Sequence, residues 1–448
     1  MHYYIYPAGG GGNCVAWLIE FFNHKEGRSD TYSFIDDSNP KTSLESCYKE
    51  IKDCEVLIAS DRFYEKLVDN LLAFGIRNFS NGIKKFAKEL NANFSNSGKN
   101  VGLICDDYAS QKHFGNIAEE LENAGFRVFY LKLFGSHEYN VDLTDTNALL
   151  IVSDFLSYLH FCPLMIGTTF HYVVHREVKY ISLFSAYYIP NFHLYYHTRE
   201  ARGRAFSHCE IASFVNYYIV CSNKKSYESL VEFFEKNNGY KERLLKLGYP
   251  SLDREVKSYR QQEECVKDTI IVLAVVRREF LKKLAERLIN ALLEKTDYRI
   301  VYKTHNGHPE LFEQEKQFVS QWIDDDNFVF YTEANLTPQE LKRSITLIES
   351  RSSLLYTYPL ITGKPSIILQ PDSKFLESSE DNFYEERLHI KAFCVEDVLE
   401  ILILLENAQF CAKREEMVED YRKNDAYCFG EASKSIVQFI CECFQKYI

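Results

Sequence analysis

Residues 344–369 read SITLIESRSSLLYTYPLITGKPSIIL. Residues 344–348 predict a buried strand, and residues 353–360 predict a helix. Gly363 and the pair Lys364-Pro365 end that helix, after which residues 366–369 predict a second strand. Strands that alternate with helices through short turns are typical of a parallel sheet with helices on both faces.

The same alternation runs from residue 101 to the end of the chain. It predicts one lobe over residues 99–255 and a second over residues 266–448, connected by the charged stretch 254–267. Residues 1–95 predict a smaller unit, which the polar stretch 95–99 would link to the rest. The expected fold class is therefore α/β, with two Rossmann-like lobes of the GT-B type and a small N-terminal Rossmann-like domain.

Composition and charge narrow the range of functions. The net charge is -12 and no run of Lys and Arg exceeds two residues, which argues against nucleic acid as a partner. The 13 cysteines are scattered without a CxxC pair, which indicates reduced thiols in a cytoplasmic protein. No stretch of about 20 apolar residues predicts a membrane span, so attachment to the inner membrane would be peripheral.

Hydroxyl side chains mark a candidate phosphate site after the strand at 344–348. Ser350, Ser352 and Ser353 lie where the next helix begins. The free N–H groups of a first helical turn, its dipole and these hydroxyls attract an anion. The alternative is a simple helix cap, but a cap needs only one hydroxyl. The run therefore favours binding of a donor phosphate by Ser352 and Ser353.

A second candidate site follows the strand predicted at 298–302 and contains Lys303, His305 and His308. Ligands of parallel sheets bind where the strands end. An imidazole beside a leaving phosphate stabilises the charge that develops as the bond breaks. Arg277 follows the first strand of the same lobe and either pairs with a diphosphate or begins a solvated helix. We expect Lys303, His305 and Arg277 to bind phosphate and His308 to be catalytic.

The stretch 349–365 resembles the CDP-glycerol glycerophosphotransferase family, in which an acidic-aromatic-Ser-Ser run precedes a helix and a Lys-Pro turn. Ser352, Ser353, Lys364 and Pro365 match that pattern, whereas Glu349 and Arg351 depart from it. The hydroxyl run is also similar to one in bacterial sialyltransferases and capsule Kdo transferases. These resemblances imply a donor activated by CDP or CMP and a glycan or polyol-phosphate acceptor.

Other segments resemble the same family. His308-Pro309 resembles a His-Pro pair whose histidine contacts the donor phosphate, and His305 is the alternative match. Residues 248–253 resemble a Gly-x-Pro-x-x-Asp turn at the lobe junction. Residues 188–193 resemble a segment with a catalytic histidine, which implies His193 as the base that deprotonates the acceptor. Further histidines on that lobe are His113, His171, His175 and His197.

The N-terminal unit carries a Gly-rich turn, residues 8–13, between a strand and a helix, and an acidic pair after the next strand. This is the order of a nucleotide-binding βαβ unit. It resembles the N-terminal domain of the sugar acyltransferases that make bacillosamine-type sugars, in which these elements hold a nucleotide sugar. The alternative is that the glycines only allow a tight turn and close helix packing. The candidate ligand residues are Gly9, Gly10, Gly11, Asp36 and Asp37.

The sequence thus predicts a cytoplasmic transferase that needs neither a metal nor another cofactor. The acidic run 324–326 is expected to be a solvated turn rather than a metal site. Two alternatives stay open: a CMP-sugar glycosyltransferase of the sialyl- or Kdo-transferase type, and a non-catalytic nucleotide-binding scaffold. The oligomeric state also stays open, and a homo-oligomer is one alternative.

Overall fold

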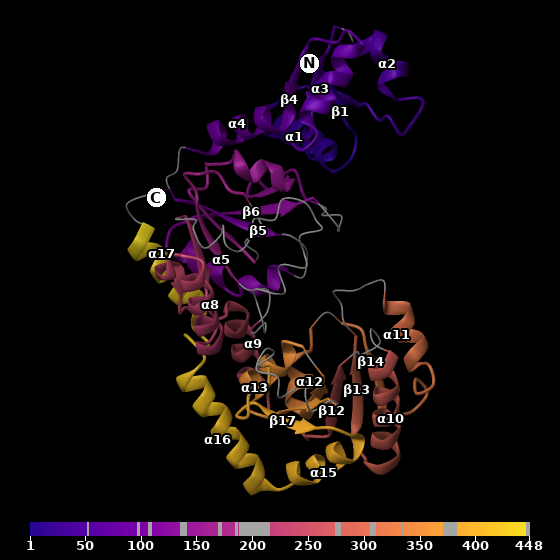
Figure 1. Ribbon diagram of the computed structural model, residues 1–448, viewed down its shortest axis with the longest axis vertical. Helices are drawn as coiled ribbons and strands as arrows, with labels where there is room; N and C mark the ends of the chain where they lie inside the picture. The colour runs from indigo at the N-terminus through magenta and orange to yellow at the C-terminus, as the bar shows by residue number, and fades with distance from the viewer. Residues whose placement is uncertain are drawn as a thin grey trace.

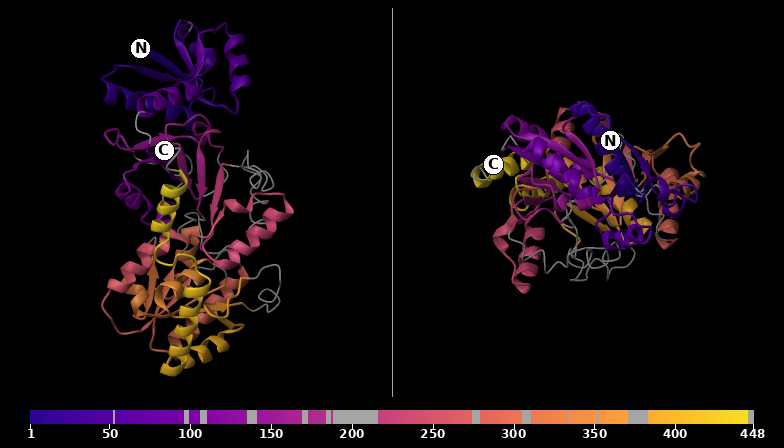
Figure 2. Two further views of the ribbon diagram at one scale, coloured as in Figure 1. Left: turned by 90° about the vertical axis from the view of Figure 1, so that its left-hand side faces the viewer. Right: turned by 90° about the horizontal axis from the view of Figure 1, so that it is seen from above.

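The structure is a computed structural model. It describes residues 1–51, 53–95, 99–105, 110–134, 141–168, 173–183, 187, 216–273, 279–304, 311–333, 335–350, 352–370 and 383–444. Three parallel sheets follow one another along the long axis of the molecule (Figures 1 and 2). The prediction of two Rossmann-like lobes preceded by a small α/β unit is confirmed. No helix in the described part of the chain is long and apolar enough to cross a membrane.

The N-terminal sheet has the strand order β2-β1-β3-β4. Its elements are β1 (His2–Tyr6), α1 (Gly10–Glu26), β2 (Thr31–Phe34), α2 (Leu44–Ile51), β3 (Glu55–Ile58), α3 (Tyr64–Ala73), β4 (Phe79–Asn81) and α4 (Gly82–Phe94). Helix α1 begins at the glycines because it lies directly against the ends of two strands. A Cβ atom at Gly11 would lie 1.9 Å from the carbonyl oxygen of Ala59. Only glycine allows this approach.

The N-terminal unit and the middle lobe share one hydrophobic core. Phe94, at the end of α4, lies 5.1 Å from the ring of Phe129 and 5.4 Å from that of Phe161, measured between centroids. The ammonium of Lys25 on α1 lies 3.6 Å from the centroid of the Phe94 ring. The short connection at residues 95–99 therefore joins two units that are packed against each other.

The middle sheet has the strand order β11-β10-β9-β8-β5-β6-β7, in which β5 to β10 follow the 3-2-1-4-5-6 order of a doubly wound fold. Its elements are β5 (Asn100–Cys105), η1 (Ser110–Phe114), α5 (Ile117–Asn123), β6 (Arg127–Leu133), β7 (Ala148–Ile151), η2 (Ser153–Ser157), β8 (Leu164–Gly167), β9 (Lys179–Ser182), β10 (Tyr217–Val220), α8 (Lys224–Lys236), η4 (Lys241–Arg243) and β11 (Leu244–Leu245).

The C-terminal sheet repeats this topology with the order β14-β13-β12-β15-β16-β17. Its elements are β12 (Thr269–Leu273), α10 (Glu279–Lys295), β13 (Arg299–Lys303), α11 (Phe312–Val319), β14 (Phe328–Tyr331), α12 (Pro338–Arg343), β15 (Ser344–Glu349), α13 (Leu354–Thr362), β16 (Ser366–Leu369), β17 (His389–Ala392), α15 (Val395–Leu405) and α16 (Ala408–Asn424). The strand, helix and strand predicted over 344–369 are therefore present as β15, α13 and β16.

The connection between the lobes is mostly a helix, α9 (Pro250–Gln261). Its few apolar side chains, Leu252, Val256 and Tyr259, recur at helical spacing and pack into the core below α13. On the other side, the first residue of α9 lies against the middle lobe. A Cβ atom at Gly115 would lie 2.0 Å from the carbonyl oxygen of Pro250. Helix α9 thus packs against both lobes.

The last helix, α17 (Ala432–Phe444), returns to the middle lobe (Figure 1). Its apolar side chains Ile436, Val437 and Ile440 belong to the core around β5. The buried carboxylate of Asp253 on α9 accepts hydrogen bonds from the N–H groups of Ala432 at 3.0 Å and Ser433 at 2.6 Å. Asp253 therefore caps a helix that lies about 180 residues further along the chain.

We expect Asp253→Ala to lower the free energy of unfolding by about 2 kcal/mol, because two buried N–H groups lose their acceptor. Urea denaturation followed by circular dichroism measures the loss. Asp326→Ala is the matched control, since Asp326 is exposed and should cost less than about 0.5 kcal/mol. Equal losses in the two variants would show that the long-range cap does not stabilise the fold.

Candidate functional site

The carboxyl ends of the strands in the two large sheets face each other around the start of α9; we call this place the interlobe region. In the C-terminal sheet, β12 lies between β13 and β15. The strand order reverses there, and ligands of doubly wound sheets bind beyond the strand ends at such a reversal. The described residues at these ends are Leu273, Lys303, Thr304, Glu349 and Ser350.

Several predicted site residues lie outside the described residues. Arg277 follows β12 in the chain, and His305 and His308 follow β13. His193, and the further histidines His171 and His197, belong to the middle lobe. Their predicted roles therefore stay predictions.

Lys303 is buried at the end of β13. Its ammonium donates a hydrogen bond to the carbonyl oxygen of Thr304 at 2.9 Å and lies 5.9 Å from the centre of the Tyr331 ring. Burial lowers the pKa of Lys303 to about 8, and the nearby cation of Lys112 adds to the lowering. Lys112 belongs to η1 of the middle lobe. Two cations, one from each lobe, therefore approach the same place.

The three serines of the predicted hydroxyl run have different surroundings at the start of α13. The Ser352 hydroxyl accepts a hydrogen bond from the N–H of Leu354 at 3.3 Å, in the turn just before the helix. Ser350 is buried behind it. No hydrogen bond of the Ser353 hydroxyl involves another described residue. Ser353 is thus the hydroxyl of this run that is available to a ligand at the helix start.

Three tyrosines fix the first turn of α13 against the middle lobe. The ring of Tyr187 lies 5.9 Å from that of Tyr249 and 6.0 Å from that of Tyr356, between centroids. The Asn223 amide donates a hydrogen bond to the Tyr187 carbonyl oxygen at 3.1 Å. Since Tyr356 lies on α13 and Asn223 on the middle lobe, this cluster sets the position of Ser353 relative to both sheets.

Lys364, which matches the Lys-Pro turn of the family pattern, faces away from this region. Its ammonium donates hydrogen bonds to the carbonyl oxygens of Leu341 and Lys342, both at 2.9 Å, and of Ser344 at 2.5 Å. Those carbonyls lie at and just beyond the end of α12. Lys364 therefore closes a helix terminus rather than contacting a ligand.

The described histidines of the middle lobe include His113, at the lobe junction, and a neighbouring pair, His160 and His175. His113 is buried, with Nδ1 2.6 Å from the hydroxyl oxygen of Tyr249, and burial lowers its pKa to about 3. Its imidazole is therefore neutral and helps to join the lobes. His175 lies 5.2 Å from His160, between ring centroids, near the N-terminal unit. His160 and His175 thus lie beside each other, but next to the N-terminal unit rather than in the interlobe region.

Sequence reasoning missed two charged residues of the interlobe region, Lys112 and Glu255. The Glu255 carboxylate accepts a hydrogen bond from the Ser251 hydroxyl at 2.9 Å. Loss of hydration raises the pKa of Glu255, and the cation of Lys112 opposes that rise. No sequence motif marks either residue. The packing of η1 on α9 brings Lys112 near Glu255 and, across the lobes, near Lys303.

The glycines of the N-terminal turn make packing contacts. Gly9 has a positive φ of 128°, which favours glycine. A Cβ atom at Gly10 would lie 3.1 Å from the ring of Phe134 in the middle lobe, and Gly11 lies against Ala59. These contacts agree with the alternative that the glycines allow a turn and close helix packing.

The acidic pair after β2 also has internal partners. Asp37 accepts hydrogen bonds from the Tyr6 hydroxyl at 2.5 Å and from the N–H of Leu44 at 3.0 Å. Asp36 accepts one from the N–H of Ser38 at 3.0 Å. Both carboxylates therefore close the loop between β2 and α2, and a ligand at this place would have to displace those bonds or share the acceptors.

In the described ranges, no group of three or more His, Cys, Asp and Glu side chains is placed to hold a metal ion. The cysteines of the same ranges are free thiols, most of them buried or half-buried.

No protein-family model matches the sequence, and no curated protein matches it significantly. Solved structures do match the fold. The wall teichoic acid polymerase TagF, in a His-to-Asn variant soaked with CDPG, superposes with a TM-score of 0.56 at 17% identity, over 86% of this chain and 98% of that chain. The structure of S. aureus MnaA with UDP superposes with a TM-score of 0.53 at 13% identity, over 78% and 98%.

The chain has a GT-B fold. At these identities the likeness establishes the fold of the lobes and neither a donor nor an acceptor. It gives no support to the resemblance of the N-terminal unit to sugar acyltransferases.

Anion binding in the interlobe region should weaken as the pH rises through about 8, because Lys303 then loses its charge. A nucleotide phosphate, with a second pKa of about 6, keeps its charge over this range. Calorimetric titration of CDP at several pH values between about 7 and about 9 measures the effect. Lys303→Arg should bind CDP with little change over the same range, and a flat wild-type profile would contradict a role for Lys303.

Proposed function

We propose that the chain is a transferase that moves a group from a CDP- or CMP-activated donor to a glycan or polyol-phosphate acceptor. One observation carries the proposal. The buried Lys303 and the helix start at Ser353 lie at the ends of β13 and β15, on either side of β12, where the strand order reverses. A cation and a helix N-terminus at such a reversal suit a nucleotide phosphate.

The proposed reaction is a displacement without a metal. The acceptor oxygen forms a bond to the transferred group, while the bond from that group to the nucleotide phosphate breaks. His193 takes the acceptor proton. Lys303 and the first turn of α13 bind the released phosphate, and His308 with His305 stabilises its developing charge. Arg277 pairs with the diphosphate of the donor.

The likeness to TagF supports a cytidine-activated donor, because that protein was studied with CDPG. The likeness to MnaA, solved with UDP, supports a second candidate, a uridine-activated sugar. A sialyl- or Kdo-transferase-like use of a CMP-sugar belongs to the first class, and a non-catalytic scaffold would bind a nucleotide without turnover. A cytoplasmic enzyme held at the surface of the inner membrane suits an acceptor destined for the cell envelope.

The proposal predicts that Ser353→Ala and Lys303→Gln each reduce turnover with the cognate donor by about tenfold to a hundredfold, mainly by weakening phosphate stabilisation. Release of CMP, CDP or UDP from a panel of CDP-polyols, CMP-sugars and UDP-sugars measures turnover. Ser320→Ala is the matched control, because Ser320 is exposed and bonds only to the Gln317 carbonyl oxygen.

Turnover with UDP-sugars, but with none of the CDP- or CMP-activated donors, would show that the donor nucleotide is uridine rather than cytidine. If calorimetry finds no binding of CMP, CDP or UDP, the interlobe region is not a nucleotide site. Nucleotide binding without release from any donor would favour the scaffold.

A further inference from the structure

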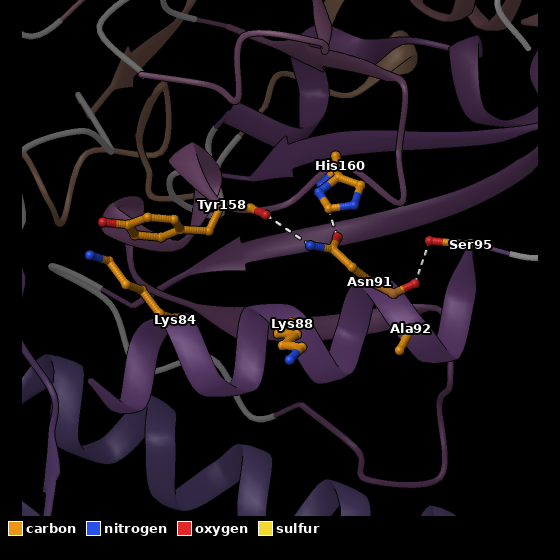
Figure 3. Close-up of a pocket in the computed structure, with 7 residues that line it drawn as sticks. All are labelled: Lys84, Lys88, Asn91, Ala92, Ser95, Tyr158 and His160. Atoms are coloured by element: carbon orange, nitrogen blue, oxygen red, sulfur yellow. Dashed lines mark hydrogen bonds between the residues drawn. The ribbon is translucent and has the colours of Figure 1, made fainter. Parts of the chain in front are cut away.

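A cavity with two lysines at its rim lies between helix α4 of the N-terminal unit and the loop that precedes β8 (Figure 3). Its volume is about 440 Å³. The residues that line it are Lys84, Lys88, Asn91, Ala92, Ser95, Tyr158 and His160. It lies on the side where β5 and β8 begin, whereas the interlobe region lies where the strands end. The two places are therefore separate.

One face of α4 supplies most of this cavity. Lys84, Lys88 and Asn91 follow one another at spacings of four and three residues, so they share that face. Two lysines four residues apart repel each other and destabilise a helix slightly. Within the described residues neither of them has an ion pair, whereas the adjacent Lys85 pairs with Glu55 at 2.8 Å. The unpaired charges thus gather at the cavity.

The opposite wall is held rigidly. The buried Asn91 side chain donates to the carbonyl oxygen of Tyr158 at 2.9 Å and accepts from the N–H groups of His160 at 2.9 Å and Phe161 at 3.0 Å. The Tyr158 hydroxyl donates to Asp61 at 2.5 Å. These bonds fix the loop to the N-terminal unit on both sides, so the cavity is formed before any ligand binds.

The chemistry of the lining defines a ligand class. Its charged or titratable side chains are two lysines, a histidine and a tyrosine, with no carboxylate, and its Ser95 hydroxyl already donates to the Asn91 carbonyl oxygen. Lys84 lies 5.3 Å from the centre of the Tyr158 ring, which positions its charge at one end. Ammonium groups are common ligands of phosphate. The volume is that of a small-molecule site and exceeds the needs of a bare ion.

We propose that this cavity binds a small phosphate ester of the size of a sugar phosphate. Lys84 and Lys88 hold the phosphate, and the groups near Ala92 and Ser95 leave room for the polyol part. Because the cavity is built by two units at once, its ligand also stabilises their packing. The proposal does not depend on the function of the interlobe region.

The test is calorimetric titration of the full chain with glucose 6-phosphate, glucose and inorganic phosphate, in a Lys303→Gln background that weakens anion binding in the interlobe region. Glucose 6-phosphate should bind more tightly than either other probe. The double variant Lys84→Gln/Lys88→Gln should lose about tenfold in affinity or more. Ala92→Tyr should abolish binding by filling the cavity while every charge is kept.

Lys66→Gln is the matched control, because Lys66 is exposed on α3 outside the cavity. The affinity of this variant for glucose 6-phosphate should differ from that of the unsubstituted cavity by less than about twofold. Since Lys84, Lys88 and Ala92 are exposed, an unchanged melting temperature without ligand should confirm that each variant folds. Wild-type affinity in both cavity variants, or an equal loss in Lys66→Gln, would overturn the proposal. Loss in Ala92→Tyr alone would overturn the phosphate assignment.

Discussion

The arrangement of the two lobes depends on the contacts of one short helix, α9, and above all on the carboxylate of Asp253. Burial raises the pKa of this group, and the two N–H groups at the start of α17 oppose that rise. The bond connects the helix between the lobes with the helix that ends the chain. Because α9 also contacts α13 and η1, this one capping interaction helps to hold the interlobe region together.

Local patterning predicted the elements, because the strands of a doubly wound sheet are apolar runs separated by short turns. Residues 344–369 are an example, since the predicted strand, helix and strand are present there. The helical connection α9 was not predicted as a helix, since its three apolar side chains among charged residues gave a weak signal. Lys112 and Glu255 could not be found at all. The approach of Lys112 to both Lys303 and Glu255 results from packing between segments far apart in the chain.

The N-terminal unit shows how one motif can serve two purposes. Its Gly-rich turn has the order of a nucleotide site, but here the carboxyl edge of its sheet is occupied by the middle lobe. Phe134 lies against Gly10, and the Tyr158 hydroxyl bonds to Asp61 just after β3. A Gly-rich turn allows close approach either of a phosphate or of a neighbouring side chain, and its sequence is the same in both cases. Only the surrounding structure distinguishes them.

The charges of the interlobe region suggest why a ligand would draw the lobes together. Lys303 and Lys112 come from different lobes; the cation of Lys112 lowers the pKa of Lys303, whereas the carboxylates of Glu315 and Glu333 raise it. The repulsion between the two lysines acts against close approach of the lobes, and these carboxylates offset part of it. An anion bound between the two lysines would turn this repulsion into a net attraction. Each lysine would then have a negatively charged partner in a place partly removed from water. The tyrosines around Tyr187 and the cap at Asp253 hold α9 against both lobes, so a bound anion acts on lobes that are already joined by these contacts.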